Sequence, residues 1–263
     1  MGRTGRRLLC VALLALSACS PATADPTASD NALNGEVTVF AAASLTDAFT
    51  EIGQTFEAAH PGATVTFNFA GSQQLSTQIV EGAPADVFAS ADQRQMDSVV
   101  DAGLTAGAPA AFAGNRLEIA VEPGNPTGIA TLADLARDDV TVVLAADEVP
   151  AGRYAREALD AAGVTAAPVS LETDVRGVLT KVSLGEADAG IVYASDIAAV
   201  GDRVDGVEIP DEHNVTAAYP IAALRSAPRS AAGQAFVAMV RSEVGQETLG
   251  RHGFLQDLGQ PSR

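Results

Sequence analysis

Residues 37–49 read V-T-V-F-A-A-A-S-L-T-D-A-F, and this stretch predicts how the rest of the chain is organised. Its first five residues favour a buried strand, because they are mostly β-branched or aromatic. From Leu45 to Ala59 apolar side chains recur at helical spacing, so Ser44 lies at a strand-to-helix joint. The first N–H groups of a helix have no hydrogen-bond partner within the helix. Together with the positive end of the helix dipole and a nearby hydroxyl, they favour the binding of an anion. Alternatively, Ser44 or Thr46 only caps the helix.

The same joint recurs along the chain. Strands are expected at 65–69, 86–90, 117–121, 140–145, 169–171, 188–192, 207–209 and 217–223. Helices are expected to begin near Ser72, Asp92, Pro150, Asp174 and Ser195, with others at 132–136, 230–240 and 246–251. Such alternation is typical of α/β proteins with parallel sheets, in which ligands bind at the carboxyl ends of strands.

Several residues at or near these strand ends are candidates for a binding site: Ser44, Ser72, Ala151, Val175 and Tyr193. Pro150 suits the first position of a helix, so the residues beside it, Ala151 included, offer free amides. The side chains of Ala151 and Val175 give no reason to choose these residues as candidates for the site. Tyr193 is equally consistent with a buried tyrosine at a strand end, hydrogen-bonded to any neighbour.

The first 34 residues have the composition of a targeting segment and a linker. Residues 1–18 carry three arginines and then an apolar run that is too short to span a bilayer, which is typical of a signal peptide. The run ends in L-S-A-C at Cys19, a pattern that resembles the lipobox of bacterial lipoproteins, so we expect Cys19 to carry a lipid. The alternative is an ordinary signal peptide with an incidental cysteine. Residues 19–34 are small, polar and aperiodic, and we expect a flexible tether.

Cysteine usage and charge restrict the classes of function. Cys10 and Cys19 are the only cysteines, so the domain after them has no disulfide and no cysteine-based metal site or nucleophile. After residue 18 the chain has 13 basic and 33 acidic residues, a formal charge of −20. This charge disfavours nucleic acid and anionic membrane surfaces as partners. The remaining length suffices for one large domain or two ordinary lobes.

The sequence gives little support for an enzyme or a metal site. It contains no G-x-S-x-G, H-E-x-x-H or G-x-x-x-x-G-K-[ST] motif, and its three histidines are dispersed. Asp86 and Asp92 could bind a cation, although Asp92 is well placed to cap a helix. No other carboxylates, histidines or cysteines are grouped with the spacing of metal ligands. The recurring feature is a hydroxyl beside a helix N-terminus, a set of donors that suits a fully ionised oxyanion.

Five segments resemble those of the molybdate-binding proteins of ABC transporters, and they occur in the order found in that family. They are V-T-V-F-A-A-A-S-L-T (37–46), G-A-P-A-D-V-F-A-S-A-D (82–92), V-P-A-G-R-Y-A (149–155), E-T-D-V-R-G-V-L (172–179) and G-I-V-Y-A-S-D (190–196). The resemblance implies an α/β, two-lobed type II periplasmic binding protein with a ligand cleft between the lobes. Residues 35–115 and 221–263 would form lobe one and residues 116–220 lobe two, with two crossings acting as a hinge.

The resemblance also implies a ligand and the residues that hold it. Molybdate, or tungstate equally well, would be bound by Ser44, by Ser72 through its side chain, its backbone or both, by the hydroxyl of Tyr193 and by the amides of Ala151 and Val175, without a directly ligated metal cation or a cofactor. At 69–74 the chain reads F-A-G-S-Q-Q, which departs from the serine run of several relatives.

The expected protein is an exported monomer, anchored through Cys19 to the outer face of the cytoplasmic membrane, that delivers its ligand to an ABC permease. The alternatives are a binder of sulfate or another oxyanion, or an enzyme on the same fold such as a hydroxymethylbilane synthase. The latter family tethers its cofactor to a cysteine, and here only Cys19 would remain.

Overall fold

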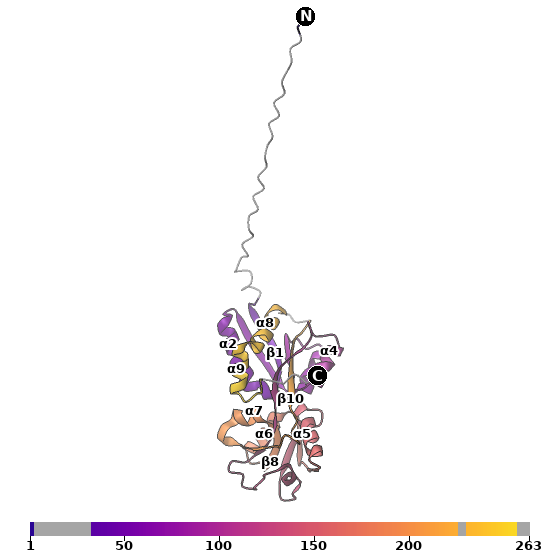
Figure 1. Cartoon of the computed structure of the whole chain (residues 1–263), viewed down its shortest axis with the longest axis vertical. Helices are drawn as coiled ribbons and strands as arrows, with labels where there is room; N and C mark the ends of the chain where they lie inside the picture. The colour runs from indigo at the N-terminus through magenta and orange to yellow at the C-terminus, as the bar shows by residue number, and fades with distance from the viewer. Residues whose placement is uncertain (3–32, 226–229, 257–263) are drawn as a thin grey trace.

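The computed structural model describes residues 1–2, 33–225 and 230–256. These residues form two α/β lobes, each built on its own five-stranded sheet and stacked along the long axis of the molecule (Figure 1). Cys19 lies outside the described residues, as do nearly all of the predicted signal peptide and of the predicted tether. Within the described ranges no helix has the length and apolarity required to cross a membrane.

The first lobe contains the sheet that begins with the stretch quoted above. Its strand order is β2 (Ala63–Ala70), β1 (Gly35–Ala42), β3 (Val87–Ala89), β10 (Ala217–Ala223) and β4 (Ala110–Asn115). β1 is parallel to β2 and β3, whereas β10 is antiparallel to β3 and β4. The carboxyl ends of β1 and β2 therefore lie side by side, which brings the segments that follow them together.

Helices cover both faces of the first sheet. Val37, Val39 and Ala41 face one cluster of apolar side chains, and Phe40 between them faces another, as the alternation of a strand requires. On the first face lie α2 (Thr46–Ala59), α8 (Ser230–Arg241) and α9 (Glu243–Arg251), and α3 (Ser72–Val80) and α4 (Gln93–Asp101) lie on the second. Burial on both faces fixes the strand ends that carry the site.

The second lobe has a sheet of the same size, with the strand order β7 (Ser170–Glu172), β6 (Val142–Ala145), β8 (Ala189–Tyr193), β5 (Leu117–Val121) and β9 (Asp205–Glu208). β6 is parallel to β7 and β8, and β5 is antiparallel to β8 and β9. Its helices are α5 (Pro150–Ala161), α6 (Val175–Ser183) and α7 (Ala194–Val200), with short 3-10 helices at η2 (Leu132–Ala136) and η3 (Gly201–Arg203).

The chain passes between the two sheets twice. The first crossing is Arg116, between β4 and β5, and the second is the segment between β9 and β10. Asn214 ties the two together, because its side chain donates to the Leu117 carbonyl at 2.9 Å and accepts from the Leu117 amide at 3.0 Å. The expected boundary at residue 220 falls inside β10, all of which lies in the first sheet.

Two features of the sheets differ from the sequence-based expectation. The sheets are mixed rather than parallel, because β5 and β10 are entered by the crossings between lobes and not through a helix. β4 was not predicted, because A-A-F-A-G-N consists mostly of small residues with low strand preference. Its pairing with β10 is a long-range contact that local sequence does not encode.

Candidate ligand-binding site

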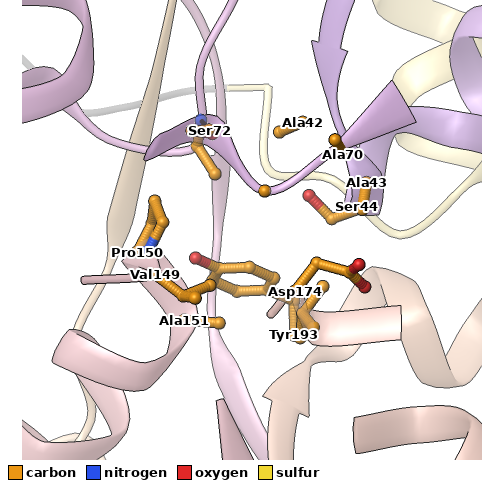
Figure 2. A pocket seen from close by; sticks show the side chains of 13 residues that line it. Ala42, Ala43, Ser44, Ala70, Ser72, Val149, Pro150, Ala151, Asp174 and Tyr193 are labelled. Atoms are coloured by element: carbon orange, nitrogen blue, oxygen red, sulfur yellow. Dashed lines mark hydrogen bonds between the residues drawn. The ribbon is translucent and has the colours of Figure 1, made fainter. Parts of the chain in front are cut away.

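The segments after five strands meet between the lobes and line one pocket (Figure 2). β1 and β2 of the first lobe lead to Ser44 and Ser72, and β6, β7 and β8 of the second lobe lead to Ala151, Val175 and Tyr193. All five candidate residues line this one pocket. The other lining residues are Ala42, Ala43, Ala70, Gly71, Ala91, Val149, Pro150 and Asp174.

Ser44 lies on a short 3-10 helix, η1 (Ala43–Leu45), between β1 and α2. The alternative role of a helix cap does not hold for it, because neither helix start here receives a hydrogen bond from a capping side chain. Thr46 instead donates to the Ala43 carbonyl at 2.7 Å. Ser44 Oγ lies 2.9 Å from the Tyr219 hydroxyl, and the residue is buried. The serine hydroxyl is thus held from behind by a tyrosine of β10.

Ser72 is the first residue of α3, and its hydroxyl is held in a comparable way. The Ala91 amide donates to Ser72 Oγ at 3.0 Å. A hydroxyl oxygen that accepts from one side still has its own hydrogen to donate. Ser72 is buried and lines the pocket, so that hydrogen is available to a group bound there.

Ala151 and Val175 contribute backbone amides at the starts of α5 and α6. Within the described residues neither amide donates to a backbone carbonyl, as expected for the first turn of a helix. Both helix N-termini also present the positive end of their dipoles to the pocket. Gly152 allows α5 to start this close to β6, because a Cβ there would lie 2.1 Å from the Ala146 carbonyl oxygen.

Tyr193 ends β8, and its side chain is 1% exposed. Its hydroxyl has no hydrogen-bond partner among the described residues, and the Tyr219 ring packs against the Tyr193 ring with the centroids 5.8 Å apart. Burial raises the pKa of Tyr193 well above the usual value for tyrosine, so the hydroxyl keeps its hydrogen. A buried donor without an acceptor is unfavourable unless a ligand supplies one.

The charges around the pocket are few. None of the thirteen described lining residues is a lysine, arginine or histidine. Asp174 is the one charged side chain among them, and it caps α6 by accepting from the Gly177 amide at 3.0 Å. The pocket therefore offers hydroxyl and amide donors without a counter-charge, which suits an anion that only accepts hydrogen bonds.

The two aspartates considered as cation ligands instead bind backbone amides. Asp92 accepts from Gln95 N at 2.9 Å and caps α4, as the sequence predicted. Asp86 accepts from Thr38 N at 2.8 Å. In the part of the chain that the structure describes, no three histidine, cysteine or carboxylate side chains are grouped as metal ligands.

Comparison with known proteins places the chain in a family. A family model described as bacterial extracellular solute-binding protein matches residues 37–255. The chain belongs to this family. Solute-binding proteins of this kind are transport components rather than enzymes.

The relatives of this solute-binding protein also confirm the resemblance noted in its sequence. The molybdate-binding protein ModA of Mycobacterium tuberculosis (strain H37Rv) is 45% identical over 247 residues, which are 94% of each chain. The periplasmic molybdate-binding protein of Azotobacter vinelandii has a TM-score of 0.71 at 18% identity, over 85% of this chain and 100% of that one. The sulfate-binding protein SubI of Mycobacterium tuberculosis has a TM-score of 0.75 at 19% identity, over 84% and 86%. These two structures share the fold, which alone does not distinguish the two anions.

Polar contacts join the two lobes of the solute-binding protein around the pocket. Arg153 of α5 pairs with Asp92, which is 1% exposed, at 2.7 Å. Arg176 of α6 pairs with Asp47 of α2 at 2.7 Å. On the remaining side Gln73 Nε2 donates to the Thr173 carbonyl at 2.9 Å. The lobes are thus in contact with each other across the site.

Sequence reasoning missed the residues that lie behind the pocket. Tyr219 contacts Ser44, and Asn115 contacts Tyr219, but they lie 175 and 71 positions from Ser44 in the chain, on β10 and β4. The nearest signal in the sequence was the predicted strand at 217–223, in which a tyrosine stands out among small residues. No local sequence pattern linked this tyrosine to Ser44 on η1.

Proposed function

We propose that this chain is the exported, lipid-anchored component of an ABC importer that binds molybdate, and tungstate equally well, for delivery to a membrane permease. The observation that carries the proposal is the pocket between the lobes, whose described lining offers five hydroxyl or amide donors and no basic side chain. The names of the relatives support the choice of molybdate.

The chemistry of the ligand fits the donors. Molybdate and tungstate are tetrahedral dianions whose oxygens accept hydrogen bonds and donate none. Ser44 and Ser72 approach from the first lobe, and Ala151, Val175 and Tyr193 from the second. An anion that touches both lobes favours the closed arrangement through contacts that the open one lacks. The same donors would hold the ligand and report its presence to the permease.

Sulfate is the second candidate, since a sulfate-binding protein shares the fold. Sulfate offers the same charge and geometry with a smaller radius. A rigid set of donors cannot contract around it, so some hydrogen bonds would lengthen. Each charge-assisted hydrogen bond lost is worth about 1.5 to 3 kcal/mol, so losing two would weaken binding roughly 10²- to 10⁴-fold.

Calorimetric titration of the protein with molybdate, tungstate, sulfate and phosphate tests the proposal. Molybdate and tungstate should bind with similar affinity and sulfate far more weakly. Phosphate at neutral pH keeps a proton, and the one carboxylate in the lining, Asp174, is already engaged with Gly177. Equal affinity for sulfate and molybdate would favour the second candidate, and binding of none of the four would refute an oxyanion carrier.

The lipid anchor is a separate part of the proposal and rests on L-S-A-C at residues 16–19. Replacing Cys19 by serine should release the protein from the membrane fraction of expressing cells, because a serine cannot form the thioether to the lipid. Fractionation and detergent partitioning measure the release. A Cys19→Ser variant that partitions like the wild type would show that the cysteine is incidental.

A further inference from the structure

A buried chain of hydrogen bonds runs behind the pocket and ends on Ser44. Asn115 Nδ2 lies 2.7 Å from Ser195 Oγ and 3.5 Å from the Tyr219 hydroxyl, and that hydroxyl lies 2.9 Å from Ser44 Oγ. All four residues are at most 3% exposed. Water cannot compete for these groups, so the protein itself determines which atom donates to which.

Asn115 sets the donor-to-acceptor direction of this chain of hydrogen bonds. Asn115 Oδ1 accepts from the Arg116 amide at 3.0 Å, which leaves the NH₂ group facing Ser195 and Tyr219. An amide nitrogen can only donate, so the Tyr219 oxygen accepts from it. The Tyr219 hydrogen is then free to be donated to Ser44 Oγ.

Tyr219 keeps that hydrogen at any ordinary pH. Burial raises the pKa of its hydroxyl far above the usual tyrosine value. Because the Tyr219 oxygen already accepts from Asn115, we assign Tyr219 as the donor and Ser44 Oγ as the acceptor in the one hydrogen bond that Ser44 Oγ makes with the described residues. With its oxygen engaged from behind, the serine hydrogen is left to point into the pocket that Ser44 lines.

We propose that Tyr219 and Asn115 are positioning residues, which orient the Ser44 hydroxyl so that it donates to the bound anion. The inference rests on the proposed function, because it names what makes one donor of that site effective. Neither Tyr219 nor Asn115 lines the pocket, so each acts through Ser44 and not on the ligand.

The chain of hydrogen bonds also links the two lobes. Asn115 ends β4 in the first lobe, directly before the crossing at Arg116, and Ser195 belongs to α7 of the second lobe. Asn115, which donates to Tyr219 and so orients its hydroxyl, is therefore itself held at the hinge between the lobes. Orientation of Ser44 is complete when the lobes are in the relative position that the structure shows.

A double-mutant cycle between Tyr219→Phe and Ser44→Ala tests the proposal by molybdate titration. The Tyr219 ring packs edge-on against Phe112, Tyr193 and Phe254, with centroids 6.3, 5.8 and 5.5 Å away, and phenylalanine keeps that packing. Without the tyrosine hydrogen, Ser44 is no longer oriented, and affinity should fall about five- to tenfold. In the Ser44→Ala background the same change should alter affinity less than about twofold, because no hydroxyl remains to be oriented.

Ser72→Ala supplies the matched control cycle. Ser72 is a donor of the same pocket, but it is held by the Ala91 amide and not by Tyr219. Tyr219→Phe should therefore cost the same five- to tenfold in the Ser72→Ala background as in the wild type. A Tyr219→Phe effect that is equal in all three backgrounds would mean that the hydroxyl acts only through general stability, and the inference would be overturned.

Asn115→Asp gives a second cycle that does not depend on the folding of Tyr219→Phe. An aspartate can still accept from Arg116, but its other oxygen would draw the Tyr219 hydrogen away from Ser44. In the wild-type background affinity should fall at least tenfold. In the Ser44→Ala background it should fall clearly less, because the added charge acts equally in both backgrounds and only the loss that acts through Ser44 is absent. Equal losses would overturn the inference. A wild type that binds none of the oxyanions would instead refute the proposed function, and the inference with it.

Discussion

The hydroxyl of Tyr193 is the least satisfied polar group of the site, because burial deprives it of water and no described residue accepts from it with good geometry. Such a group costs about 1 to 3 kcal/mol of desolvation. Its place in the fold is explained if an anion oxygen completes its hydrogen bonding.

Tyr193→Phe should therefore weaken molybdate binding while leaving the empty protein as stable as the wild type, or more stable by about 1 kcal/mol. Loss of one donor to a doubly charged ligand corresponds to roughly a 10- to 150-fold weaker affinity. Calorimetry and thermal unfolding measure the two effects. Tyr154→Phe, which removes a hydroxyl away from the pocket lining, is the control. Unchanged affinity in Tyr193→Phe would exclude its hydroxyl from the site.

Asp196 is a second residue whose environment has a measurable consequence. It is fully buried beside Arg176, with Nε 2.8 Å away, and it accepts from the Tyr193 amide at 3.1 Å. Burial raises the pKa of Asp196 to about 6, while Arg176 acts in the opposite direction and Asp47 adds to the rise. The folded protein thus binds a proton that the unfolded chain releases near the ordinary aspartate pKa of 3.8.

From this difference we expect Asp196 to lower stability as the pH rises from about 4 to 6, by at most about 3 kcal/mol above that range. The sign follows because the folded state holds more protons than the unfolded state within this window. Asp196→Asn stays neutral, so the free energy of unfolding of the wild type minus that of the variant should fall with pH. Urea unfolding at several pH values measures this difference. A flat or rising difference would contradict the expectation.

At the scale of elements, Gly71 at the start of α3 lies against the opposite lobe. A Cβ on Gly71 would lie 2.6 Å from the Thr173 carbonyl oxygen, which belongs to the second lobe. The φ angle of −59° is one that alanine adopts readily, so the restriction comes from the other lobe and from the nearby Gln73 side chain, not from the local backbone.

Gly71→Ala should therefore fold with a melting temperature close to that of the wild type but bind molybdate more than about tenfold more weakly, because its closed state is obstructed. Small-angle scattering should show less compaction on adding molybdate than for the wild type. Gly107→Ala, where a Cβ would meet nothing within 4 Å, is the matched control. Full affinity and full compaction in Gly71→Ala would show that Thr173 moves aside.

The elements show how far the sequence could predict this fold. Periodicity located most strands and helices, because strand alternation and helical spacing are local properties. It could not locate β4, whose small residues form a strand only beside β10, or the antiparallel placement of β5 and β10. Both depend on where the chain crosses between lobes, and such pairing is settled by tertiary contacts.

The site was predictable to a different extent. Ser44, Ser72 and Tyr193 carry hydroxyls at strand ends, so residue type and position pointed to them. Ala151 and Val175 are proposed to act through amides, which every residue other than proline possesses, and only the family resemblance selected them. The orienting residues Tyr219 and Asn115 were not predicted, because no local pattern connects β4 and β10 with Ser44.

For the molecule as a whole, the net negative charge of the protein repels the proposed anionic ligand. The full chain carries a formal charge of −17, and the ligand proposed here is a dianion. Its association rate constant should therefore rise with ionic strength, several-fold between about 20 and 200 mM salt, as screening weakens the repulsion. The dissociation rate should change much less, since the contacts in the pocket are shielded from solvent. Stopped-flow mixing at a series of salt concentrations measures both, and an association rate that falls with salt would contradict the expectation.

The positions of the aromatic residues give this protein an optical probe of its own. The chain contains no tryptophan and three tyrosines. Tyr193 and Tyr219 belong to different lobes and stand edge to face with their centroids 5.8 Å apart. Any change in the separation of the lobes alters the surroundings of both chromophores at once. In a Tyr154→Phe background, ultraviolet emission would arise from this pair alone, so that opening and closing could be followed in unlabelled protein as they occur.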